Sequence, residues 1–178
     1  MNHGTSWYIG CPLSGKTTLG LQKLEESARI LGGKKLIIDC RRVSTFETYP
    51  HAPDVYSVAT EIRLGKIPCF TPENEKDFEA VIALVARAGW SHVLIDEANL
   101  FLSPNYVSPN LKGLMRDARH HHVSLHLTTQ YIGDLPPVAF SFDPTVYVFR
   151  CRGSRNLDRV QKEFDLSPAV VENLPQFS

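Results

Sequence analysis

Hydrophobic positions along the chain fall into two patterns, short continuous runs and longer segments in which apolar residues recur at helical spacing. Continuous runs of this length are typical of strands in parallel sheets, because helices cover both faces of such sheets. The runs that predict strands lie at residues 6–9, 34–40, 66–71, 91–97, 123–130 and 145–150.

The segments with helical spacing lie at residues 18–31, 75–88, 108–120 and 154–165, and a short last helix begins at Ser167. Asn74 or Glu73 is expected to start the second of these helices, and Gly89 to end it. Ser154 is expected to cap the helix at 154–165. Strands that alternate with helices predict an α/β fold with a mostly parallel central sheet and helices on both faces.

The remaining segments are polar or broken by proline. Residues 54–65 fit either a short helix or an irregular insert, and residues 131–143 fit a loop or a broken helix. Residues 41–53 and 99–110 are expected to be irregular, the latter near the active face.

Length and composition predict one globular domain over residues 1–178, with a short helical tail at about 154–178. The 19 basic and 19 acidic residues cancel, so overall charge gives no support for nucleic-acid binding. The four cysteines form no C-x-x-C pair, which argues against a zinc site or a disulfide framework and favours a reduced, cytoplasmic setting. Without an apolar run of roughly 20 residues or an export signal, we expect a soluble protein that does not insert into membranes.

The stretch between the first predicted strand and the first helix fills the pattern G-x-x-x-x-G-K-[ST] of a phosphate-binding loop. Glycines at both ends let backbone N–H groups surround a phosphate, and the following helix points its positive dipole end at the anion. Lys16 would reach the β- and γ-phosphates of ATP, and Thr17 would place its hydroxyl on Mg²⁺. The residues predicted to bind the nucleotide are Gly10, Cys11, Pro12, Leu13, Ser14, Gly15, Lys16, Thr17 and Thr18.

The predicted strand at 91–97 ends in two carboxylates, Asp96 and Glu97. After a phosphate loop, such a strand end is the Walker B arrangement, in which the Asp holds Mg²⁺ directly or through water. A Glu directly after it can polarise the attacking water as a base. We therefore expect Asp96 to be a metal ligand and Glu97 the catalytic carboxylate.

Three further polar features have two interpretations each. Gln130 ends the strand at 123–130 and fits either a sensor of the γ-phosphate or an ordinary polar strand end. Arg41 and Arg42 follow a strand, where they fit either the ligand crevice of an open α/β sheet or a solvated turn. The histidines at 120–122 are interpreted as a polar helix end, because three neighbours point in different directions and cannot share one metal ion.

The order of these motifs resembles the HerA/FtsK superfamily of RecA-like (ASCE) P-loop ATPases that pump DNA. Residues 114–130 carry most of the resemblance, with an arginine-containing helix end, a hydrophobic strand and a Thr-Gln end, followed by Leu135 and Pro136. The brevity of the chain is similar to the genome-packaging ATPases of membrane-containing (PRD1-like) viruses. Family members with cellular roles usually carry an extra DNA-tracking or membrane domain, and we expect none beside this ATPase core, which leaves the DNA contacts unidentified.

The resemblance implies an ATPase that translocates double-stranded DNA, most simply into a viral capsid, with ATP and Mg²⁺ as cofactors. It implies a homo-oligomeric ring (pentamer or hexamer), a capsid vertex or portal protein as a partner, and a place in the host cytoplasm or at the virion vertex. An arginine from one subunit would complete the next subunit's site; Arg119 matches the family's helix-end arginine, and Arg150 and Arg152 are rivals. Lys112 and residues 99–110 are candidates for contacts in the DNA channel.

Two alternatives stay open. A small NTP-dependent phosphotransferase, similar to a nucleoside or nucleotide kinase, would need an acceptor pocket and an arginine-rich lid. The candidates for that lid are Arg41, Arg42, Arg150, Arg152 and Arg155. A regulatory protein that binds nucleotide and switches partners would not require Glu97.

Overall fold

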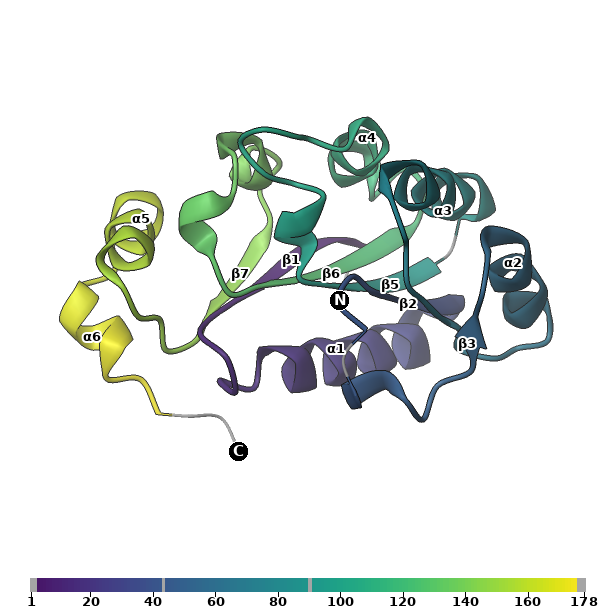
Figure 1. Ribbon diagram of the computed structural model, residues 1–178, viewed down its shortest axis with the longest axis horizontal. Coiled ribbons are helices and arrows are strands. Elements are labelled where there is room, and N and C mark those ends of the chain that lie inside the picture. The colour runs from purple at the N-terminus through teal and green to yellow at the C-terminus, as the bar shows by residue number, and fades with distance from the viewer. Residues whose placement is uncertain (1–2, 43, 90, 176–178) are drawn as a thin grey trace.

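The computed structural model describes residues 3–42, 44–89 and 91–175, and a seven-stranded sheet forms its centre (Figure 1). The strand order is β3-β4-β2-β5-β6-β1-β7, and every pairing between neighbours is parallel. The strands are β1 (Gly4–Ile9), β2 (Lys34–Asp39), β3 (His51–Ala52), β4 (Cys69–Phe70), β5 (Ser91–Asp96), β6 (Val123–Thr129) and β7 (Thr145–Val148). The predicted α/β class with a parallel sheet is therefore confirmed.

Helices cover both faces of this sheet. In Figure 1, α1 lies along one face and α3 and α4 lie over the other, while α5 and α6 lie beyond β7. The helices are α1 (Lys16–Leu31), α2 (Val55–Arg63), α3 (Glu75–Ala88), α4 (Pro109–Asp117), α5 (Ser154–Phe164) and α6 (Pro168–Glu172). Short 3₁₀ turns lie between them: η1 (Ser44–Phe46), η2 (Ala98–Leu100), η3 (Ile132–Asp134) and η4 (Pro137–Phe140).

The alternation of side chains along each strand divides the core between the two faces. Trp7 and Ile9 of β1 belong to the larger cluster of buried side chains, and the indole N–H of Trp7 donates to the carbonyl of Ala139 at 3.0 Å. Leu24 of α1 and Leu94 of β5 belong to a smaller cluster on the other face. The central strands β1, β2, β5 and β6 are largely buried on both faces, which explains why they appear in the sequence as continuous apolar runs.

The edge of the sheet at β3 and β4 differs from the prediction. The strand expected at 66–71 is limited to Cys69–Phe70, since Pro68 and Pro72 flank these residues and proline cannot donate to a strand ladder. The stretch expected to be irregular at 41–53 contains β3, which pairs with β4. Both strands are two residues long, too short for a periodic pattern to reveal.

Helix ends also differ from the prediction in several places. The helix expected at 108–120 ends at Asp117, and His122 adopts a left-handed φ of 54° in the turn that follows. Gly153, with a φ of 85°, occupies the cap position expected for Ser154, which instead begins α5. The helix alternative for 54–65 is confirmed by α2, whose cap Asp54 accepts from the backbone N–H of Ser57 at 2.7 Å.

Two global features concern the surroundings of the protein. All four cysteines are free thiols. Within the described part of the chain, none of the helices combines the length and apolar character that crossing a bilayer demands.

Candidate nucleotide site

The predicted phosphate loop connects β1 to α1 at the carboxyl end of the sheet. Gly10 donates its N–H to the carbonyl of Thr129 at 3.2 Å, and Cys11 donates to the carbonyl of Arg150 at 2.8 Å. The loop is thus fixed to both strands that flank β1. Backbone hydrogen bonds to two neighbouring segments therefore help to hold the loop in shape, in addition to its own glycines.

Close packing and backbone conformation explain the residue types in the loop. A Cβ at Gly10 would lie 2.6 Å from the Cβ of Phe149 and 2.7 Å from the Oγ of Ser14, closer than real Cβ atoms approach. Gly15 caps α1 with a φ of 91°, which favours glycine. The first N–H groups of α1 have no partner within the helix and face the loop, as an anion site requires.

A buried hydroxyl in the loop supports a fit to phosphate. Ser14 is 1% exposed, and its Oγ has no hydrogen-bond partner among the described residues. Lys16, the residue expected to reach the β- and γ-phosphates, is 5% exposed, so its charge is held within the site and away from bulk water. A buried cation beside an orphaned hydroxyl is stabilised when an anion enters the loop.

The predicted metal ligands lie against each other. The hydroxyl of Thr17 donates to Oδ1 of Asp96 at 2.9 Å, although the two residues are 79 positions apart in the chain. A hydroxyl and a carboxylate oxygen at one point, next to a phosphate loop, fit the hard oxygen ligands that Mg²⁺ takes while it keeps waters and phosphate oxygens. The chemistry of this pair therefore fits the predicted ion.

Glu97 is the most constrained residue of the site. It is 2% exposed and has a left-handed backbone, with φ 56° and ψ 50°, which is uncommon for a residue with a side chain. Its Oε1 accepts from the side-chain amide of Gln130 at 2.7 Å, and its Oε2 accepts from the backbone N–H of Gln130 at 3.2 Å. Nζ of Lys16 lies 3.7 Å from Oε1. The structure therefore brings Lys16, Glu97 and Gln130 into one cluster.

Thr128 is a site residue that the sequence did not single out. It is fully buried, its hydroxyl donates to Oδ1 of Asp96 at 2.8 Å, and the same hydroxyl accepts the backbone N–H of Glu97 at 3.0 Å. It thus holds both carboxylate residues in place. A pair of threonines at the end of a buried strand was the available signal, but its meaning depends on β6 lying beside β5.

The thiols of Cys40 and Cys151 are held in the protonated form. Burial raises the pKa of Cys40 well above its ordinary value, and the carboxylates of Asp96 and Asp39 raise it further. Burial also raises the pKa of Cys151 to about 11. A thiol becomes a nucleophile as its thiolate, so neither of these two thiols is prepared to act as one.

The three rival arginines lie in two different regions. Arg119 lies at the amino end of the sheet, where it lines a cavity with Gly4 and Ser124. The length of β1 separates it from the phosphate loop by about 17 Å, so it cannot reach its own subunit's site. Arg150 and Arg152 instead line a cavity of about 440 Å³ beside the loop, together with Gln130.

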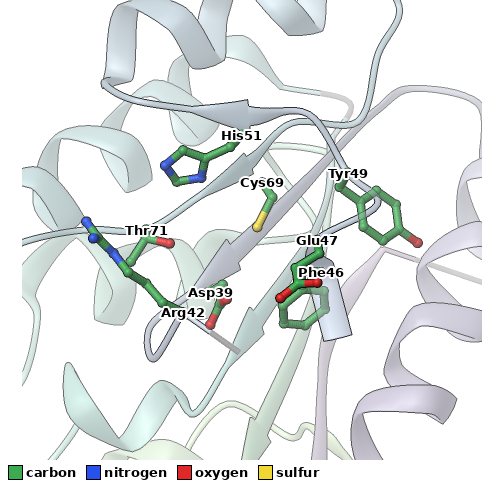
Figure 2. A pocket seen from close by; sticks show the side chains of 8 residues that line it. All are labelled: Asp39, Arg42, Phe46, Glu47, Tyr49, His51, Cys69 and Thr71. Carbon is green, nitrogen blue, oxygen red and sulfur yellow. The ribbon is translucent and has the colours of Figure 1, made fainter. Parts of the chain in front are cut away.

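A second cavity, of about 330 Å³, lies at the same end of the sheet (Figure 2). Its lining consists of Asp39, Arg42, Phe46, Glu47, Tyr49, His51, Cys69 and Thr71. Asp39 is the register partner of Asp96, so the cavity begins one strand away from the predicted metal ligand. Arg42 reaches this cavity, which favours the crevice interpretation of Arg42, while its guanidinium also contacts Glu73 at 3.4 Å.

Comparison with known proteins identifies the fold. No protein-family model matches the chain, and no curated protein matches it in sequence. Solved structures match the chain in fold. The genome packaging NTPase B204 from Sulfolobus turreted icosahedral virus 2, in complex with sulfate, superimposes with a TM-score of 0.77 at 20% identity, covering 99% of this chain and 88% of that one.

Other structures give the same result. The ATP-gammaS complex of the same NTPase has a TM-score of 0.76 at 19% identity, over 99% of this chain and 89% of that one. B204 described as the DNA-packaging ATPase from Sulfolobus Turreted Icosahedral Virus gives 0.73 at 20% identity, over 99% and 91%. The chain shares the fold of these solved structures along almost its whole length. The predicted fold class is confirmed.

Proposed function

We propose that the protein is an ATP-hydrolysing motor that translocates double-stranded DNA into a viral capsid. The observation that carries the proposal is the cluster at the carboxyl end of the sheet, in which Glu97 lies between Lys16 and Gln130 beside the phosphate loop. The fold shared with packaging NTPases over almost the whole chain supports the DNA substrate. A pure nucleotide switch would not need the carboxylate of Glu97.

In this proposal the phosphate loop and Lys16 bind the phosphates of ATP, and Thr17 and Asp96 hold Mg²⁺. The ion, when bound, neutralises charge that develops on the β- and γ-phosphates. Glu97 accepts a proton from the attacking water. The oxygen of that water bonds to the γ-phosphorus, and the bond between the γ-phosphorus and the bridging oxygen breaks, so that ADP leaves. Gln130 already bonds Glu97, so it can transmit the loss of the γ-phosphate to β6 and the loop after it.

A ring of five or six copies would place ATP between neighbours, and a capsid vertex or portal protein would anchor that ring. Arg119 is exposed and lies at the end of the sheet opposite to its own site. It can therefore act only on another subunit, as an arginine that stabilises transition-state charge in trans. Lys112, exposed on α4, and residues 99–110 stay candidates for the DNA channel. Such a ring works in the host cytoplasm or at the virion vertex.

The test is ATP turnover by the purified protein with and without double-stranded DNA. We expect DNA to raise turnover, and Glu97→Gln to lower it by roughly 10²- to 10⁴-fold, the usual contribution of a general base. Glu172→Gln, on the exposed surface of α6, is the matched control and should leave turnover unchanged. Turnover that depends on Glu97 but is the same without DNA would contradict the motor.

The cavity of Figure 2 favours a phosphotransferase as the second candidate. It lies one strand from Asp96 and could admit a small acceptor. The candidate arginines of a lid are dispersed, however: Arg42 lines this cavity, Arg150 and Arg152 line the other, and Arg155 pairs with Asp134 at 2.9 Å. Phosphate transfer from ATP to nucleosides or nucleotides, tested without DNA, would support this candidate over the motor.

A further inference from the structure

Arg150 is attached to the phosphate loop through its own backbone. It follows β7, which pairs with β1, and the N–H of Phe149 donates to the carbonyl of Ile9 at 2.8 Å. The carbonyl of Arg150 then accepts the N–H of Cys11, the second residue of the loop, at 2.8 Å. A side chain that begins here moves with the loop and belongs to the same subunit's site.

The side chain of Arg150 is charged, partly buried and incompletely satisfied. Its Nε is shielded from water and has no hydrogen-bond partner within the described ranges. No acidic side chain described in the structure forms an ion pair with it. A buried guanidinium donor without an acceptor is costly, and guanidinium groups match phosphate oxygens with paired donors.

The residues around the cavity that Arg150 lines indicate which part of a bound nucleotide would reach it. Cys11, Pro12 and Leu13 form one wall, and Gln130 forms another. Gln130 hydrogen-bonds directly to Glu97, and Glu97 in turn faces Nζ of Lys16, the first residue of α1. An anion between Arg150, Gln130 and the tip of the loop therefore lies at the end of the phosphate chain, and not beside the nucleoside.

We propose that Arg150 is a catalytic residue that binds the terminal phosphate of the nucleotide in its own subunit. The proposal rests on the proposed function, and it removes Arg150 from the candidates for an arginine donated by a neighbour. Its guanidinium stabilises the charge on the equatorial oxygens of the transferred phosphoryl group in cis. Arg119 and Arg152 stay the candidates for the role in trans.

The test compares binding of ATPγS and ADP to Arg150→Gln, at a dilution where light scattering reports a monomer. We expect ATPγS affinity to fall by roughly 10- to 100-fold, the effect of losing a charge-assisted contact, and ADP affinity to stay unchanged. Arg63→Gln, at the exposed end of α2, is the control and should leave both affinities unchanged. Equal losses for the two nucleotides, or no loss, would overturn the proposal.

Arg150→Lys provides a second variant that keeps the charge and guards against misfolding. It should give an intermediate loss confined to ATPγS, because an ammonium replaces a paired donor with a point charge. An Arg150→Lys variant that binds ATPγS as tightly as the parent while Arg150→Gln fails to fold would overturn the assignment. These binding measurements need neither DNA nor turnover. The motor proposal can therefore fail while discrimination between ATPγS and ADP stays intact, and the two failures can be told apart.

Assembly gives an independent readout of the subunit to which Arg150 belongs. Glu97→Gln and Arg150→Gln chains mixed in equal amounts contain no subunit with both groups, so turnover should stay at the level of the separate variants. If Arg150 acted on a neighbour, about a quarter of the sites in a randomly mixed head-to-tail ring would recover both groups. Such recovery would overturn the proposal.

Discussion

The carboxyl end of the sheet and the face of the sheet beneath α1 both bury polar side chains, but they satisfy them differently. Beneath α1, a histidine network consists of Tyr8, Ser27, His92 and His126. His126 contacts the Tyr8 hydroxyl at 2.9 Å and Ser27 Oγ at 3.4 Å, while His92 contacts Ser27 Oγ at 2.8 Å and the Gly32 carbonyl at 2.6 Å. Each ring nitrogen of these two histidines has a protein partner.

At the carboxyl end, by contrast, the buried groups are ionised and some donors have no partner. Lys16 and Glu97 carry opposite charges, and Ser14 Oγ and Arg150 Nε lack hydrogen bonds within the described residues. A closed neutral network rigidifies a fold, whereas a charged cluster with open donors needs a further ligand. The difference distinguishes the cluster that is built to bind a ligand from the network that stabilises the fold.

The largest effect on this comparison is expected from Gly10→Ala. The new Cβ would meet Phe149 and Ser14 within 2.7 Å, so β7 or the loop must move. We expect a loss of about 3 kcal/mol in the free energy of unfolding, at the upper end for overpacking, together with loss of nucleotide binding. Gly113→Ala is the matched control, since a Cβ there meets nothing within 4 Å. Urea unfolding and ATPγS titration measure both; a stable Gly10→Ala that binds ATPγS would contradict the close packing.

A smaller effect is expected from Thr128→Val, which keeps the shape and removes the hydroxyl. The N–H of Glu97 loses its acceptor and Asp96 loses one donor, and leaving such buried groups unsatisfied costs about 2 kcal/mol. Turnover should fall as well, because both carboxylates lose their positioning. Thr60→Val, on the exposed surface of α2, should change neither quantity. Parent-like stability and turnover in Thr128→Val would mean that the bridge through Thr128 is dispensable.

A third effect concerns the histidine network and acid. Burial lowers the pKa of His126 to about 3, and burial also lowers the pKa of His92. The unfolded chain, with a histidine pKa near 6.5, binds more protons between these values, so stability is full above about pH 6.5 and falls as the pH drops below it. Each such group contributes a slope of about 1.4 kcal/mol per pH unit.

The measurement is urea unfolding between pH 7 and pH 5 for the parent and for His126→Gln. In His126→Gln, the free energy of unfolding should change less steeply with pH, by about the contribution of one histidine. His120→Gln, at an exposed position, should keep the pH dependence of the parent. An unchanged slope in His126→Gln would show that His126 does not contribute to the acid sensitivity.

Local patterns predicted the parts of the site that lie close together in the sequence. The phosphate loop and its strand and helix depend on consecutive residues, and the two carboxylates directly follow an apolar run. The positions of the arginines could not be predicted in this way, because they depend on which end of the sheet each segment reaches. Thr128 and Arg150 lie at the site because β6 and β7 flank β1. Strand order is set by long-range packing, which a local pattern does not reveal.

The placement of β6 between β1 and β5 also has a consequence for how the chain folds. Thr17 and Asp96 are 79 positions apart, and their contact requires three parallel strands to be in register. Parallel pairings between distant segments form slowly, because loop closure precedes the contacts that reward it. The nucleotide site is therefore completed late in folding. A bound nucleotide should protect the whole central sheet from proteolysis, because it binds only chains in which that sheet has already formed.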